Sequence, residues 1–150
     1  MRYIIELIDK LTKDAEDEVF WLGAADENQI ALLEEKLMVN LPDDFKGFLS
    51  VVGGGGIVGE EISGIVDNNA LAESGGAVYY DTCYCRNEYE LPNELVVIYF
   101  KDDDVCWCIN TSATDFGSVV NYNLFSRKVD RKMHPTFTCF FDNYVKARIK

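Results

Sequence analysis

The chain has 150 residues and a formal net charge of −12, from 26 acidic and 14 basic side chains. This charge disfavours binding to phosphate backbones and to anionic membrane surfaces, because both need a basic face. No apolar run approaches the ~20 residues that span a bilayer, and the N-terminal residues lack the apolar segment and cleavage site of a signal peptide. We therefore expect a cytoplasmic protein whose five cysteines stay reduced.

Three amphipathic helices are predicted in the first third of the chain. Residues 2–13 place apolar side chains at helical spacing, as do residues 27–39. Asp26 and Gln29 have the spacing of a capping box, which would begin the second helix. The third helix is predicted over residues 42–52, with proline at its first position, where its missing N–H is not needed.

A run of four glycines, 53–56, ends the third helix. Before it, Phe45, Phe48, Leu49 and Val52 recur at helical spacing and form one apolar face. A glycine directly after a helix can adopt the left-handed conformation that closes it. The run lacks the lysine of a phosphate-binding loop. We therefore interpret it as a helix end and a tight turn into the sheet.

The middle of the chain combines β-prone and loop-like segments. Residues 57–66 mix Ile and Val with Gly, which predicts strands with bends. Residues 67–76 have turn composition and predict a loop. We expect a strand over the aromatic residues 77–85, because aromatic side chains favour strands, and a polar loop over residues 86–93.

The last third of the chain predicts a hairpin, a further strand and a closing helix. Two β-prone runs flank an acidic turn, so residues 95–109 are expected to form a hairpin. A strand is expected over residues 118–122, and the pattern assigns no element to residues 123–132. Pro135 precedes a wide apolar stripe over residues 137–145, which predicts the final helix.

One ordered set of residues resembles a known family. The glycine run follows it, and it reads Ile30-x-x-Leu33-Glu34-x-x-Leu37-x-x-x-Leu41-Pro42-x-x-Phe45-x-x-Phe48-Leu49. This order resembles the SUKH superfamily, the fold shared by bacterial immunity proteins and by fungal cell-wall assembly regulators of the Smi/Knr type. Helices first, strands in the middle and one closing helix predict the α+β class. The resemblance implies a single domain over residues 1–150, in which N-terminal helices and a C-terminal helix pack on a central, largely antiparallel sheet of about six strands.

Cysteine and histidine side chains are the candidates for metal or thiol chemistry. Cys83 and Cys85 form one Cys-x-Cys pair, and Cys106 and Cys108 form another. On neighbouring strands these four thiols would converge as zinc ligands do. We interpret them instead as small core residues and predict no metal and no cofactor. His134, the single histidine, precedes a helix start, where we expect a capping or surface role, so no catalytic residue is predicted.

Acidic residues gather at the predicted turns and strand ends. They are Glu60, Glu61, Glu88, Glu90, Asp102, Asp103 and Asp104. Such residues are often solvated loop positions. They can also form an acidic rim that faces a partner, because complementary charge speeds association and excludes wrong partners. We predict these seven residues as the partner-binding surface.

The family resemblance implies an immunity protein that neutralises a toxin by direct contact. Such toxins are often nucleases, whose phosphate-binding surfaces are basic, and an acidic inhibitor can cover them. We therefore expect a basic, nuclease-type toxin domain as the partner, and no nucleic acid or membrane. Inhibition would occur by occlusion without catalysis, and the protein would be a monomer or a weak homodimer. The alternative is an intracellular scaffold or regulator without a toxin partner.

Overall fold

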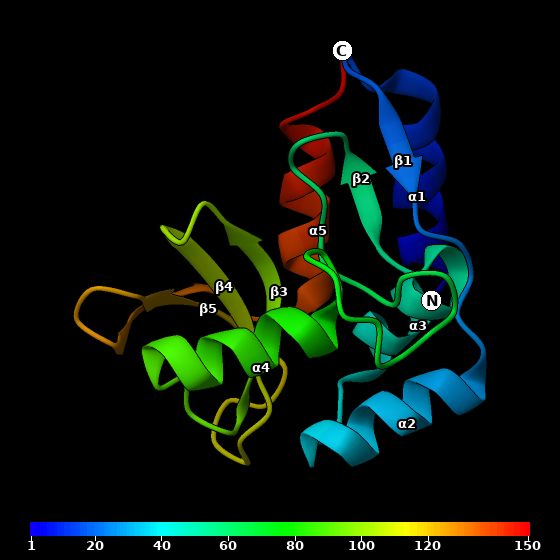
Figure 1. Cartoon of the computed structure of the whole chain (residues 1–150). Coiled ribbons are helices and arrows are strands. Elements are labelled where there is room, and N and C mark those ends of the chain that lie inside the picture. The colour runs from blue at the N-terminus through cyan, green and yellow to red at the C-terminus, as the bar shows by residue number, and fades with distance from the viewer.

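The structure, a computed structural model, describes residues 1–150 and contains five helices and six strands (Figure 1). The helices are α1 (Arg2–Asp14), α2 (Glu27–Leu37), α3 (Asp43–Val52), α4 (Val78–Tyr89) and α5 (Phe137–Lys146). The strands are β1 (Val19–Trp21), β2 (Gly55–Ile57), β3 (Leu95–Lys101), β4 (Val105–Asn110), β5 (Val119–Asn123) and β6 (Lys128–His134). The four helices predicted at the start and the end of the chain are confirmed. None of the helices has the length and apolar character needed to cross a membrane.

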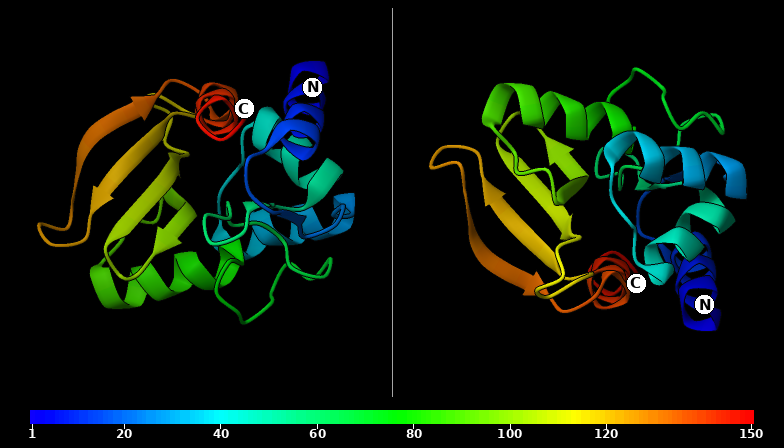
Figure 2. Two further views of the ribbon diagram at one scale, coloured as in Figure 1. Left: turned by 90° about the horizontal axis from the view of Figure 1, so that it is seen from above. Right: turned by 90° about the horizontal axis from the view of Figure 1, so that it is seen from below.

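The strands form two separate antiparallel sheets. β1 pairs with β2, and the other four strands pair in the order β3-β4-β5-β6. The predicted α+β class and antiparallel pairing are confirmed, and the six strands are divided between two sheets. Seen from above, α5 lies between α1 and the four-stranded sheet (Figure 2). The C-terminal residues return to the end of α1, where the Lys150 N–H donates to the Asp14 carbonyl at 3.1 Å.

An aromatic cluster joins the helices in the larger core. Phe48 of α3 is fully buried, and its ring centroid lies 4.9 Å from that of Phe141 and 5.0 Å from that of Phe137, both on α5. Phe45, one turn earlier on α3, lies 6.2 Å away. Trp21 of β1 meets the Phe48 ring edge-on at 6.3 Å. The cluster therefore packs α3, α5 and β1 around one side chain.

Hydrogen bonds and glycine fix both ends of α3. At its start, Asp44 Oδ2 accepts from the backbone N–H and the hydroxyl of Thr138 on α5, at 2.8 and 2.9 Å. Pro42 is the N-cap, one residue before the first helical position at which the sequence placed it. At its end, Gly53 adopts a φ of +78°, and a Cβ there would lie 1.9 Å from the Gly23 carbonyl oxygen. The predicted helix-closing glycine is therefore confirmed.

The capping box predicted for α2 is wrong. Asp26 is the N-cap, but its side chain makes no cap hydrogen bond. Asn68 Nδ2 donates to Asp26 Oδ2, and Asn68 Oδ1 accepts from the Asp26 N–H, both at 2.8 Å. Gln29 Oε1 accepts from the Ala70 N–H at 2.8 Å. Both side chains thus hold the predicted loop over residues 67–76, which is confirmed as a loop, against the start of α2.

Residues 78–89 form α4, so the strand predicted over residues 77–85 is wrong, as is the loop predicted to begin at residue 86. The buried positions of α4 do recur at helical spacing, but two of them, Asp81 and Thr82, are polar and interrupt the apolar stripe. Thr82 Oγ1 accepts from the Val97 N–H of β3 at 3.0 Å. Packing on the sheet therefore selects a helix where β-prone side chains favoured a strand.

The segment after α3 contains less strand than predicted. β2 ends at Ile57, and within residues 57–66 only isolated bridges continue the pairing, such as that between Ile62 and Gly55. The predicted hairpin is confirmed as β3 and β4, and the strand predicted over residues 118–122 is β5. β6 lies in the segment that the sequence left unassigned. Its side chains are mostly exposed, so no apolar pattern marked it.

Candidate functional site

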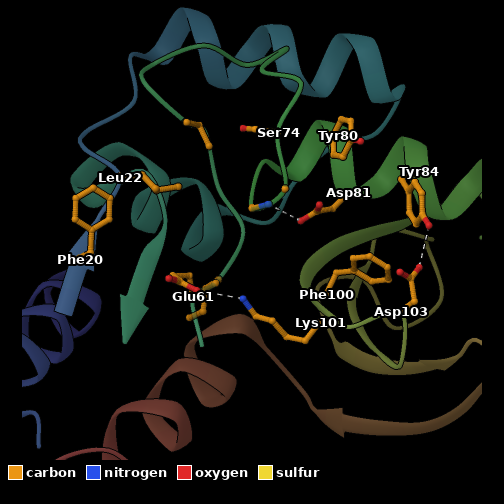
Figure 3. Close-up of a pocket in the computed structure, with 14 residues that line it drawn as sticks. Phe20, Leu22, Glu61, Ser74, Tyr80, Asp81, Tyr84, Phe100, Lys101 and Asp103 are labelled. Atoms are coloured by element: carbon orange, nitrogen blue, oxygen red, sulfur yellow. Dashed lines mark hydrogen bonds and ion pairs between the residues drawn. The ribbon is translucent and has the colours of Figure 1, made fainter. Parts of the chain in front are cut away.

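The largest cavity of the chain is a cleft of about 530 Å³ beside α4 (Figure 3). Phe20 of β1 and Glu61, which follows β2, contribute to one side. The other side is formed by Tyr80, Asp81 and Tyr84 of α4, Phe100 and Lys101 of β3, and Asp103 of the β3–β4 turn. Cavities of this volume, with apolar walls and a few polar groups, are typical of binding sites. We call this cavity the α4 cleft.

Asp81 is the most deeply placed charged group of the α4 cleft. Its side chain is only 3% exposed, and its Oδ2 accepts from the Ser63 hydroxyl at 2.8 Å and from the Gly76 N–H at 3.2 Å. Its Oδ1 has no hydrogen bond within the chain and is not sealed from the cleft. Burial raises the pKa of Asp81, although the hydrogen bonds from Ser63 and Gly76 act in the opposite direction. Oδ1 is therefore the oxygen of this buried carboxylate that the chain leaves without a partner.

Glu61 and Lys101 form an ion pair at the edge of the α4 cleft. The Lys101 Nζ lies 3.3 Å from Glu61 Oε1, and both side chains are about one-third exposed or less. Partial burial alone would raise the pKa of Glu61, but hydrogen bonds from the Gly59 and Glu61 N–H groups and from Lys101 lower it overall. The Lys101 ammonium also lies 5.1 Å from the centre of the Tyr99 ring. Lys101 is thus held in place by an anion and an aromatic face.

Asp103 connects the β3–β4 turn to α4. Its Oδ1 accepts from the Tyr84 hydroxyl at 3.0 Å and from the Tyr89 hydroxyl at 2.8 Å. The hydrogen bond to Asp103 raises the pKa of Tyr84 and raises that of Tyr89 to about 12. The Tyr84 ring also packs against Phe100, with centroids 5.7 Å apart. One carboxylate therefore fixes two tyrosines of α4 against the end of the hairpin.

The structure brings together part of the predicted acidic surface. Glu61 and Asp103 both line the α4 cleft, although 41 residues separate them in the chain. Asp102 and Asp104 flank Asp103 in the same turn, and both are exposed. The backbone φ of Asp102 is +54°, in the left-handed region. These four carboxylates make one side of the molecule, around the cleft, acidic.

The other predicted acidic residues lie apart from the α4 cleft. Glu60 does not line it and forms an ion pair with Arg148 at 3.0 Å. Glu88 and Glu90 are exposed at the C-terminal end of α4, where Glu90 forms an ion pair with Arg127 at 3.3 Å. Each of these two ion pairs therefore engages a carboxylate that was predicted from the sequence to bind a partner.

Sequence reasoning identified Glu61 and Asp103 of this cleft, but it did not identify Asp81 at its floor. Asp81 was missed because its segment was interpreted as a strand. Tyr80 and Phe20 are 41% and 56% exposed. The available signal was an aspartate within a run of tyrosines, at residues 79–84. This signal indicates a site only if the segment forms a helix, because α4 then places Asp81 towards Ser63.

The four-thiol arrangement considered from the sequence is wrong. Cys85 of α4 is buried with Cys106 and Cys108 of β4, whose sulfurs lie 3.7 Å apart. Cys83 is half-buried against the larger core instead. Hydrogen bonding to Cys106 and burial raise the pKa of the Cys85 thiol, so it stays protonated and a poor metal ligand. No group of three or more His, Cys, Asp or Glu side chains is arranged to hold a metal ion.

His134 differs from its predicted capping or surface role. Thr136 is the N-cap of α5, and its hydroxyl oxygen accepts from the Cys139 N–H at 3.0 Å. His134 is half-buried at the end of β6, with its Nδ1 3.3 Å from the Cys139 sulfur. Burial lowers the pKa of His134, so the ring is neutral at pH 7. Neither His134 nor Cys139 lines the α4 cleft.

A family model matches nearly the whole chain. The SUKH_5 model, described as SMI1-KNR4 cell-wall, matches residues 4–146. The chain belongs to this family. The resemblance found in the sequence is therefore confirmed, and the SUKH family is known for immunity proteins.

A solved structure shares the fold of this chain. A crystal structure of a protein from Pseudomonas syringae pv. tomato matches with a TM-score of 0.69, over 93% of this chain and 96% of that chain. The two sequences are 22% identical, so the likeness establishes the shared fold and nothing about activity. Comparison with curated proteins gives no match.

Proposed function

We propose that this chain is an immunity protein that binds a basic, nuclease-type toxin domain and blocks it by covering its surface. The observation that carries the proposal is the family match over residues 4–146, because the family is known for immunity proteins. In this proposal the chain acts in the cytoplasm as a monomer or weak homodimer. It supplies a binding surface and takes no part in chemistry.

The distribution of charge supports a basic partner. The net charge is −12, and Asp102 and Asp104 project from the β3–β4 turn beside the α4 cleft without an ion pair. Exposed charges at the rim of an interface act mainly on the rate of association. A nuclease domain, whose surface binds phosphates, presents the complementary charge.

Association kinetics test this proposal with a pair of matched variants. The candidate partner, which the proposed function predicts, is the C-terminal toxin domain of a secreted protein encoded beside this gene. At ~10 Å in water, one charge pair contributes about 0.4 kcal/mol, so the double variant Asp102→Asn/Asp104→Asn should associate about fourfold more slowly at low salt. Asparagine tolerates the left-handed conformation of residue 102. The difference should disappear near 1 M salt, where the Debye length is about 3 Å.

The control carries the same change of charge on another part of the surface. Asp9 of α1 and Glu35 of α2 are exposed, and Asp9→Asn/Glu35→Gln should associate about as fast as the wild type. An equal slowing of both double variants would show that only net charge matters and that the turn is not part of the surface. Absence of binding by the wild-type protein would contradict the immunity function itself.

A further inference from the structure

We propose that the α4 cleft receives one arginine side chain of the partner, with the Asp81 carboxylate as its counter-charge. The inference rests on the proposed function for the partner's identity, but the chemistry of the cleft can be tested without a toxin. It assigns a specific anchor within the acidic surface, whereas the rim aspartates act at a distance. A single buried arginine is a common energetic centre of protein interfaces.

The floor of the cleft favours a cation. Asp81 is 3% exposed, and only its Oδ2 is engaged by the chain. A buried carboxylate with an unpaired oxygen costs free energy unless a cation or donor meets it. Buried carboxylates with this free-energy cost are found at functional sites, because the charge does not stabilise the fold and is retained for binding. A guanidinium can donate an N–H to the remaining Oδ1 in a charge-assisted hydrogen bond.

The charges that line the cleft select against other ligands. Glu61, Asp81 and Asp103 contribute three carboxylates, against the single ammonium of Lys101. Lys101 is already paired with Glu61 at 3.3 Å, and Asp103 accepts two tyrosine hydroxyls. An anionic ligand would be repelled, and a neutral apolar ligand would leave Asp81 unpaired. The cation is the ligand class that satisfies this surface.

The aromatic walls favour arginine over lysine. Tyr80 and Phe20 expose 41% and 56% of their surface, and Phe100 and Tyr84 also line the cavity. Figure 3 shows Tyr80 and Asp81 projecting from the same stretch of α4 beside the cleft, with Phe100 on the β3 side. A planar guanidinium stacks on such rings, while its aliphatic stem covers their apolar surface. The more strongly hydrated ammonium of lysine gains less from this environment.

The test uses a short peptide in place of the toxin. The probe is acetyl-Gly-Arg-Gly-amide, and its control carries citrulline, which has the shape of arginine without the charge. Binding is followed by the backbone amide shifts of the ¹⁵N-labelled protein. Saturable shifts are expected at Gly75, Gly76 and Asp81. The citrulline peptide should bind about tenfold more weakly or worse, because a hydrogen bond between charged groups is lost.

Substitutions in the cleft provide the second arm. In Asp81→Asn the remaining side-chain oxygen can still accept from Ser63 and Gly76, so the fold should persist while arginine binding falls by about tenfold or more. Tyr80→Ala should weaken binding by about two- to fivefold. Glu35→Gln, an exposed change on α2, should leave it unaltered. A urea unfolding curve for each variant confirms that it is folded.

The outcomes separate this inference from the immunity function. Equal affinity for the arginine and citrulline peptides, shifts outside the cleft, or full binding by folded Asp81→Asn would overturn the inference. If the toxin domain still binds the wild-type chain in that case, the immunity function stands and the interface lies elsewhere. If the peptide binds as expected but no toxin does, the cleft is an arginine site and the immunity function is wrong.

Discussion

Replacement of Phe48 by alanine should remove the central contact of the helical core. The ring is fully buried and lies 4.9–6.3 Å, between centroids, from the rings of Phe141, Phe137, Phe45 and Trp21. Core Phe→Ala substitutions cost about 3–5 kcal/mol, and aromatic pairs add to area burial. With four ring neighbours, we expect the upper part of this range, about 4–5 kcal/mol.

Urea unfolding at pH 7 measures this loss directly. Trp21 meets the Phe48 ring edge-on, so its fluorescence reports on the site itself. For a chain of this length each kcal/mol corresponds to about 2–4 °C, so the melting temperature should fall by about 8–20 °C. The same curves should be obtained for Phe125→Ala as a control, because that ring is 100% exposed and its loss should change stability by less than about 0.5 kcal/mol.

A small effect would refute the packing argument. If Phe48→Ala loses less than about 1 kcal/mol with an unchanged dependence on urea, the ring is not buried as described. The buried face of α3 would then be misassigned.

Three further predictions concern a hydroxyl, a carboxylate and the thiols. Tyr144→Phe should cost about 1–3 kcal/mol in urea unfolding, because the buried hydroxyl accepts from the Ile57 N–H at 3.0 Å and donates to a backbone carbonyl; an unchanged curve would contradict this. Burial raises the pKa of Asp81 in the folded state above its ordinary 3.8. The stability of the wild-type protein therefore falls as the pH rises from 3.8 through the raised pKa, because over this range the folded state binds the proton more tightly than the unfolded state does. Asp81→Asn should therefore be more stable than wild type at pH 7, and a gain of equal size below pH 3.8 would refute the linkage. Of the five thiols, three are buried, so a thiol reagent should titrate at most two in the native protein and five in urea; rapid reaction of three or more in the native state would contradict the burial.

The helices at the two ends of the chain are predictable because each has an unbroken apolar stripe. On α5 the buried residues Phe137, Phe140, Phe141, Tyr144 and Val145 are those that the spacing indicates. Local pattern and tertiary packing agree there. The hairpin is predictable for the same reason, since both of its strands are apolar runs around an acidic turn.

α4 and β6 show where such reasoning fails. Two of the four buried residues of α4, Asp81 and Thr82, are polar, so its buried face is not an apolar stripe. The preference of tyrosine and valine for strands then dominates the pattern. β6 has exposed side chains such as Val129 and is held by backbone pairing with β5. Backbone pairing leaves no mark on residue type.

The candidate site was predictable only in part. Acidity at turns identified Glu61 and Asp103, but their position in one cleft depends on long-range packing of β2, α4 and the hairpin. The role of Asp81 depends on its hydrogen bond with Ser63, 18 residues away in the chain. That contact exists only because α4 turns this face towards the segment after β2. Patterns of charge in the sequence therefore do not identify a site that is built around a buried polar residue on a helix.

Survival of a bacterial host that expresses the toxin tests the immunity function most directly. The candidate toxin domain, which the proposed function predicts in a neighbouring gene, is induced in cells that carry the wild-type chain or an empty vector, and viable cells are counted. The proposed function predicts growth with the wild-type chain and with Phe125→Ala, and death with the empty vector. Death of cells that contain the folded wild-type chain at levels above those of an active toxin would contradict it.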